Sequence, residues 1–330
     1  MIQCRGSAWR WGWQFRNRAV GFFISFNLCS CTVAQFHGID FSGRLGETAR
    51  LVEEVKAFET ILGIEPTDAL SRTVQERPAF SMLWLWLQRV GTLAVRAPID
   101  IRMAVGFSDL KERLAIEQVY RVDGYSVYYR QGNEFADERS VTTVGFAAEG
   151  IVRRVKIILH EDLHGERNFS LPWEVEEAMI TPLGSLAAVE FFRWKGDQEN
   201  LRRAQDSVKE ERQYALELSA LVSEAEKLFK TENIDEAKKR ILDLIPSYPV
   251  YHRQFQRQIA RQHAPTVLEA KLSHDLTYYK YFDQIAALGE KATDLATLIN
   301  DLKTLARDWP RDDVEEYLQH LNMQYSQPAK

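Results

Sequence analysis

The apolar residues in the first third of the chain follow a helical spacing and then a continuous run. Between Thr48 and Leu62 they recur every three or four positions, the spacing of one helix face, and Gly63 follows where a helix C-cap is expected. The next run, Phe80 to Val95, is hydrophobic on all sides. We therefore expect an amphipathic helix followed by a buried element.

Further along, the pattern predicts one more helix and a small sheet. A helix is expected over 109–120, and the run 125–129 after Gly124 is rich in Tyr and Val, which favours a strand. The run 140–146 holds Val and Thr in succession and predicts a second strand. Together these runs predict a β-sheet of roughly three or four strands.

From Gly150 onward the apolar spacing is helical almost to the end, with breaks at glycines and prolines. A long charged helix is expected over 197–230, with an apolar seam through Leu201, Leu216, Leu218, Leu221 and Leu228. The pattern thus predicts an α+β fold that is predominantly helical. We expect an α+β region at 40–195 and a C-terminal helical bundle at 196–330 that packs on it.

The composition narrows the class of protein. The chain has 330 residues, of which 45% are apolar and 27% charged, so it is long and apolar enough to fold around a sizeable core. Its net charge is −5, and outside the N-terminus no basic block is interleaved with aromatic residues, so we expect no nucleic-acid partner. No run reaches the roughly 18 apolar residues of a transmembrane helix, which argues against an integral membrane protein.

The N-terminus is typical of a targeting segment, expected at 1–31. No acidic residue precedes Asp40, and four arginines come before the apolar run 19–26, which is the order of a secretory signal peptide. The run ends in Leu-Cys-Ser-Cys, which resembles the lipobox of bacterial lipoproteins, with Cys31 as the acylated residue. We expect an exported lipoprotein anchored through Cys31 to the periplasmic face of a bacterial membrane. The alternatives are a soluble periplasmic protein with a plain signal peptide, or a cytosolic protein with an amphipathic N-terminal arm.

The distribution of cysteines restricts any metal site. All three cysteines lie within the first 31 residues, so the rest of the chain has no thiolate to offer a metal. Within the helix expected after Gly150 the chain reads His160-Glu161-Asp162-Leu163-His164, which is H-E-x-x-H. Residues four apart stand on one helix face, so both imidazoles can bind one Zn²⁺ while Glu161 lies beside its water. The alternative is a buried histidine beside an ordinary surface ion pair.

A catalytic zinc site needs a third protein ligand. A second helix is expected to open at Trp173, and its Glu177 lies 13 residues after His164. The loop between them can fold this helix back beside the first, which would complete a His, His, Glu site. Glu174 shares the face of Glu177, whereas Glu176 points about 100° away. Each of these carboxylates is equally explained by the preference of helix N-termini for acidic residues.

At these residues the chain resembles a family of bacterial zinc-dependent aminopeptidases, gluzincin-like and commonly exported as lipoproteins. The likeness rests on the H-E-x-x-H motif, on Glu177 to Thr181 with Gly184 after it, and on weaker blocks at 106–109, 124–128, 142–146, 270–278 and 294–306. It implies a zincin-like fold with the small sheet beside the zinc helix. Two positions depart from the family pattern: Glu176 replaces a usual Asn, and Asp162 a usual apolar residue.

The resemblance implies hydrolysis of a peptide substrate by a zinc-activated water. His160, His164 and Glu177 would hold Zn²⁺, and Glu161 would act as the general base. Tyr278 is the first candidate for the oxyanion donor, with His274, Tyr279 and Tyr125 as alternatives. The run 141–146 would be a sheet edge that pairs with an extended peptide, or merely a short core strand.

The aminopeptidase mode comes from the resemblance alone. An aminopeptidase must hold a free amine near the metal, and Glu174 or Glu176 would be available for this role. Two other hypotheses stay open: an envelope endopeptidase, and a catalytically silent helical lipoprotein that acts as a scaffold.

Overall fold

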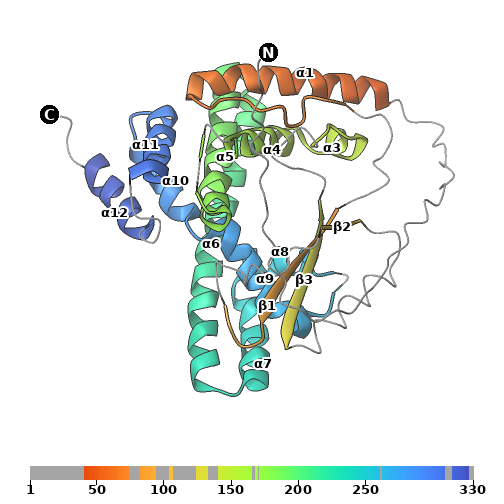
Figure 1. Ribbon diagram of the computed structural model, residues 1–330, viewed down its shortest axis with the longest axis vertical. Helices are drawn as coiled ribbons and strands as arrows, with labels where there is room; N and C mark the ends of the chain where they lie inside the picture. Colours follow the sequence, from red (N-terminus) through yellow and green to blue (C-terminus); the bar gives the residue numbers. More distant parts are fainter. Residues whose placement is uncertain are drawn as a thin grey trace, which may run out of the picture. The chain divides into compact units, whose positions relative to one another are not determined.

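The computed structural model describes residues 41–73, 82–93, 104–106, 124–132, 140–165, 168–169, 171–260, 262–308 and 314–326. The targeting segment with Cys31 and the helix expected over 109–120 lie outside these residues. Most described residues are helical, and the predicted α+β class with a predominance of helix is confirmed (Figure 1). None of the described helices has the length and apolar character needed to cross a membrane.

The first helix agrees with its sequence pattern. Helix α1 (Phe41–Glu59) continues into the short 3₁₀ helix η1 (Thr60–Leu62), and its apolar face is buried. Gly63 ends the helix in the left-handed region with φ 67°, and its N–H donates to the carbonyl of Thr60. A residue with a Cβ is disfavoured in that conformation, so glycine suits this position.

The sheet has three antiparallel strands in the order β2-β1-β3. The central strand β1 (Met82–Arg89) comes from the all-round hydrophobic run, and β2 (Ala104–Gly106) and β3 (Tyr125–Gly132) flank it. Trp86 faces Tyr128 across the β1–β3 pair, and both side chains are buried. Helix α9 (Ala264–Tyr279) packs against these two strands, as Figure 1 shows. The predicted strand at 125–129 is therefore confirmed.

The strand predicted at 140–146 is wrong. Only Thr142 forms a single bridge, to Thr73, and helix α3 (Val144–Ala148) follows at once. The Thr143 hydroxyl accepts a hydrogen bond from the N–H of Phe146 at 3.1 Å, which is an N-cap. The β-branched run mimics a strand, but its threonine starts a helix instead. The suggestion that this run forms a sheet edge for a peptide substrate is overturned with it.

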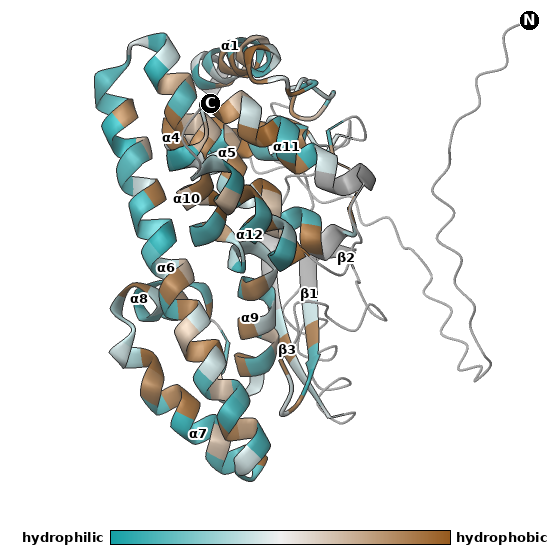
Figure 2. Ribbon diagram, turned by 90° about the vertical axis from the view of Figure 1, so that its left-hand side faces the viewer, coloured by the Kyte–Doolittle hydropathy of each residue, from teal (hydrophilic) through white to brown (hydrophobic). Residues whose placement is uncertain are grey.

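The second half of the chain is helical, as predicted. It comprises α4 (Ile151–Leu163), α5 (Trp173–Lys195), α6 (Gln198–Thr231), α7 (Ile234–Leu244), η2 (Ile245–Ser247), α8 (Pro249–Gln258), α9, α10 (Phe282–Lys291), α11 (Leu295–Asp308) and α12 (Val314–Tyr325). The long charged helix is α6, capped by Asp197, and its outer face is largely hydrophilic (Figure 2). Four of the five leucines assigned to its seam are buried, whereas Leu216 is 48% exposed and was wrongly included.

One hydrophobic core joins helices from both sides of residue 195. It contains Phe58 of α1, Leu159 of α4 and Phe191 of α5 together with Ile299 of α11 and Leu318 of α12. Residues 40–330 form one compact unit. The packing of α4, which carries the H-E-x-x-H motif, and of α5 is therefore supported by the C-terminal region.

Candidate metal centre

The two histidines of the motif lie at the C-terminal end of α4. His160 belongs to the last full turn, and His164 is the C-cap, with φ −69° and ψ −8°. Their rings are adjacent, with centroids 5.0 Å apart and planes nearly perpendicular at 84°. Because His164 lies at the helix end, its ring is oriented by its neighbours as well as by helix geometry.

Helix α5 brings a carboxylate to both rings. Oε2 of Glu177 lies 3.2 Å from Nε2 of His160, and Oε1 lies 3.5 Å from Nε2 of His164. One ligand atom from each of the three residues fits within 4.8 Å of the others. Ligands bound at about 2.0–2.1 Å in a tetrahedral zinc site lie roughly 3.3 Å apart, so this group has the donor chemistry and spacing for a divalent metal.

Glu176 holds His164 from the other side of its ring. Its Oε1 lies 2.8 Å from Nδ1 of His164, and its Oε2 accepts the N–H of Leu171 at 3.2 Å. With the carboxylate ionised, Nδ1–H donates to it and Nε2 is left facing Glu177, which is the arrangement of a metal-ligating histidine. Sequence reasoning missed this role and left Glu176 available for a substrate amine. Both of its oxygens instead bind groups of the protein, whereas the Glu174 side chain lies outside the described residues.

Two of the three candidate ligands, His164 and Glu177, carry opposite charges in the metal-free protein. Burial alone would lower the pKa of His164, but the charge of Glu177 and the hydrogen bonds from Glu176 and Glu177 outweigh it and raise that pKa to about 10. Burial likewise opposes ionisation of Glu177, yet the two histidines lower its pKa below its usual range. Burial lowers the pKa of His160. A metal ion would therefore displace a proton from His164 and take its place against Glu177.

Gly184 lets α5 approach α4 closely. It lies two turns after Glu177 on the same helix face, and a Cβ at this position would lie 3.3 Å from Cβ and 3.4 Å from Cα of His160. Such contacts are tighter than ordinary van der Waals packing, so a larger residue would push the two helices apart. The glycine thus supports the distance between His160 and Glu177.

The remaining predicted residues lie on three elements, α4, α9 and β3. Glu161 lies beside the ligands on α4, only 9% exposed, and its charge acts on His164. Tyr278 contacts His274 on α9, with ring centroids 5.0 Å apart and planes tilted by 45°, and α9 packs against α5. Of the other oxyanion candidates, Tyr279 contacts Tyr214 of α6, with ring centroids 4.7 Å apart, and Tyr125 lies under the Arg89 side chain. The role of Tyr278 stays a prediction.

The motif position that departs from the family pattern is buried on the back of α4. Asp162 is completely buried and accepts hydrogen bonds from Lys56 and Thr67. The carboxyl group of Glu59, also completely buried, interacts with it. The motif therefore contacts α1 and the segment 63–70 behind it, which the sequence alone did not indicate.

Replacing Glu59 by glutamine is expected to reduce the loss of stability at high pH. Burial first, and the charge of Asp162 second, raise the pKa of Glu59 from 4.5 to about 10. Between these values the folded carboxyl keeps a proton that the unfolded one has lost. Stability therefore falls as pH rises, by up to about 1.4 kcal/mol per pH unit from this group. Denaturant unfolding of wild type and Glu59→Gln from pH 5 to 9 checks this, and parallel curves would contradict it.

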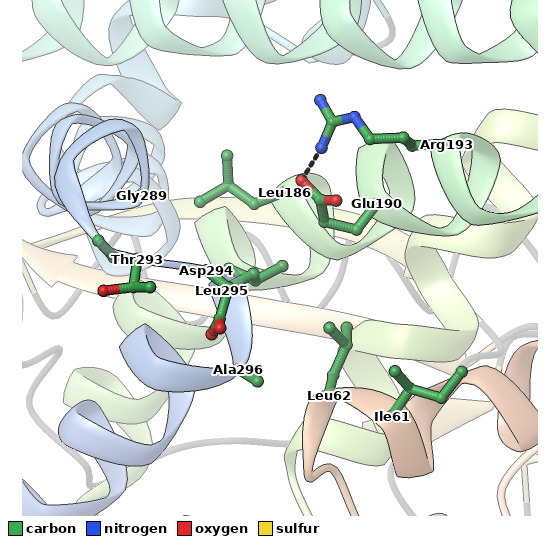
Figure 3. Close-up of a pocket in the computed structure, with 11 residues that line it drawn as sticks. Ile61, Leu62, Leu186, Glu190, Arg193, Gly289, Thr293, Asp294, Leu295 and Ala296 are labelled. Atoms are coloured by element: carbon green, nitrogen blue, oxygen red, sulfur yellow. Dashed lines mark hydrogen bonds and ion pairs between the residues drawn. The ribbon is translucent and has the colours of Figure 1, made fainter.

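A separate pocket of about 430 Å³ opens between η1, α5 and the start of α11 (Figure 3). Leu62, Leu186 and Leu295 line it, together with the paired Glu190 and Arg193. None of the candidate metal ligands lines it. It is not the metal centre.

No family model matches the chain, and neither the curated proteins nor the solved structures give a significant match. The resemblance to the bacterial aminopeptidases therefore rests on the residues quoted for it.

Proposed function

We propose that this protein is a zinc-dependent peptidase with a zincin-like catalytic region. The observation that carries the proposal is the convergence of His160, His164 and Glu177, from two helices, on one point where their ligand atoms fit a single ion. Glu176 supports it by leaving Nε2 of His164 on the side of Glu177. A scaffold has no need of three ionisable side chains arranged in this way.

The chemistry divides between the metal and Glu161. Zinc, when bound, lowers the pKa of a water molecule and polarises the scissile carbonyl group. Glu161 follows His160 in the same helix turn, so it can take a proton from the attacking water and pass it to the leaving amine. Tyr278 would donate a hydrogen bond to the oxyanion.

The aminopeptidase mode is favoured by the family resemblance, but one contact removes one of the two carboxylates considered for the substrate amine. Because both oxygens of Glu176 bind His164 and Leu171, this carboxylate does not offer a position for a free amine. An envelope endopeptidase is therefore the second candidate function. The lipid anchor on Cys31 and the location at the periplasmic face belong to the same proposal and rest on the N-terminal sequence.

Metal content and substrate preference together test the function. We expect the purified protein to hold one equivalent of zinc and to hydrolyse peptides, with activity lost to a chelator and restored by Zn²⁺. Faster turnover of aminoacyl substrates than of internally quenched peptides with blocked termini indicates an aminopeptidase, and the reverse an endopeptidase. A folded protein that binds zinc but cleaves neither class contradicts the peptidase proposal. One that binds no zinc supports the scaffold.

A further inference from the structure

Asp162 lies between the two histidines in sequence, but its carboxylate accepts its hydrogen bonds on the opposite side of α4. Its Oδ2 accepts from Nζ of Lys56 at 2.5 Å, and its Oδ1 accepts from the N–H of Thr67 at 3.1 Å and from the Thr67 hydroxyl. Lys56 also donates to the carbonyl of Thr67 at 2.9 Å. Three groups from α1 and the segment 63–70 thus meet one buried carboxylate.

The turn after α4 is held by the same segment. Asn168 donates to the carbonyl of Asp162 at 2.8 Å and to that of Glu65 at 2.9 Å, and its own side-chain oxygen accepts the N–H of Glu65. At Gly165 a Cβ would lie only 2.8 Å from Cγ2 of Thr67, so the turn and the segment are in close contact. Lys303 of α11 also donates to Asn168, at 2.9 Å.

These contacts surround His164, a candidate ligand at the very end of α4. His164 is the C-cap of α4, and the backbone at a helix end is held by fewer intrahelical hydrogen bonds than the interior. Asp162 precedes it by two residues and Gly165 follows it. Glu176 orients the His164 ring, and the contacts of Asp162 and Asn168 hold the backbone on either side of it.

We propose that Asp162 is a positioning residue of the metal centre, which anchors the last turn of α4 to segment 63–70 and so places His164 against Glu177. The inference rests on the proposed function only in that the centre binds a metal. It predicts that a change at Asp162 alters metal binding by more than its effect on stability explains.

The chain contains a matched control for this idea. Glu269 on α9 is also completely buried, accepts a backbone N–H from Gly91 at 3.0 Å and pairs with Lys238 at 3.0 Å. Asp162→Asn and Glu269→Gln therefore remove the same kind of interaction, a buried carboxylate shared by a lysine and a backbone N–H. Of these two carboxylate residues, Asp162 alone contacts the turn that carries His164.

The experiment compares zinc affinity, measured by competition with a chelating dye, with the Tm of the metal-free proteins. We expect both variants to lower Tm, and Asp162→Asn alone to weaken zinc binding, by about tenfold or more. The visible absorption spectrum of the Co²⁺-loaded protein should change in Asp162→Asn and stay as in wild type in Glu269→Gln. Zinc affinity within twofold of wild type in Asp162→Asn, or an equal loss in Glu269→Gln, overturns the proposal.

A double variant separates positioning from stability. Lys56→Met with Asp162→Leu removes both charges of the Lys56–Asp162 pair, which should recover much of the stability that a lone unpaired charge costs. Thr67 still lacks its acceptor in this variant, so we expect zinc affinity to stay low. If zinc affinity recovered together with Tm, Asp162 would act through stability alone. Zinc binding without hydrolysis in wild type contradicts the proposed function and leaves this inference standing. A wild type that binds no zinc overturns both.

Discussion

Glu161→Gln is expected to lower the rate of peptide hydrolysis by about a hundredfold or more while zinc stays bound. The amide has the shape of the carboxylate but cannot accept the proton of the attacking water. Glu161 is not one of the three residues that converge on the ion, so its replacement leaves the ligands in place. Steady-state kinetics with the best substrate, together with zinc content, measures both effects.

The control for this variant is Glu149→Gln. Glu149 lies just before α4, is exposed, and pairs with Arg153 on the same surface. We expect wild-type turnover and wild-type zinc content in the control. Hydrolysis by Glu161→Gln at the wild-type rate would show that another group accepts the proton.

Glu177→Ala is expected to remove most zinc binding. Two imidazoles are left, and a site with only two protein ligands holds zinc weakly. The replacement also leaves the buried His164 without the charge that most raises its pKa. The shape-preserving Glu177→Gln should lose zinc as well, and circular dichroism of both variants shows whether the fold is kept. Zinc content after dialysis against a weak chelator measures the loss.

Glu176→Gln tests the register of the same helix. The helical spacing places this residue about 100° from the ligand face, which by itself predicts that its loss spares zinc. The contact between Glu176 and Nδ1 of His164 changes that expectation to a fall of about 10–100-fold in affinity, which is smaller than the loss for Glu177. If zinc binding collapsed in the Glu176 variant and survived in the Glu177 variant, the assignment of ligand and support would be reversed.

Much of the fold follows from patterns that a short stretch of chain contains by itself. Helices α1, α4 and α6 each bury one face, and the helical spacing of their apolar residues identifies that face from the local sequence alone. The spacing of His160 and His164 is local in the same sense, because one helix turn sets it. The loop and helix that return Glu177 to the histidines follow from the short interval between them.

The two failures have different causes, one local and one tertiary. The run 140–146 has the composition of a strand, but a single hydrogen bond from the Phe146 N–H to Thr143 turns it into a helix start. The side chain of Leu216 matches the apolar spacing of α6 and yet is exposed, since its burial depends on which helices pack beside it.

The helical class, the motif and the spacing of the candidate ligands along the chain can therefore all be predicted from local sequence. Which carboxylates support those ligands depends on how distant segments pack together. Asp162 accepts hydrogen bonds from Thr67 and Lys56, which lie 95 and 106 positions away in sequence, and Glu176 reaches His164 because α5 packs against α4. Such contacts join segments that are far apart in sequence, and no periodic pattern marks them. The hydrogen-bonding partners of a buried charge are therefore known only from the folded structure.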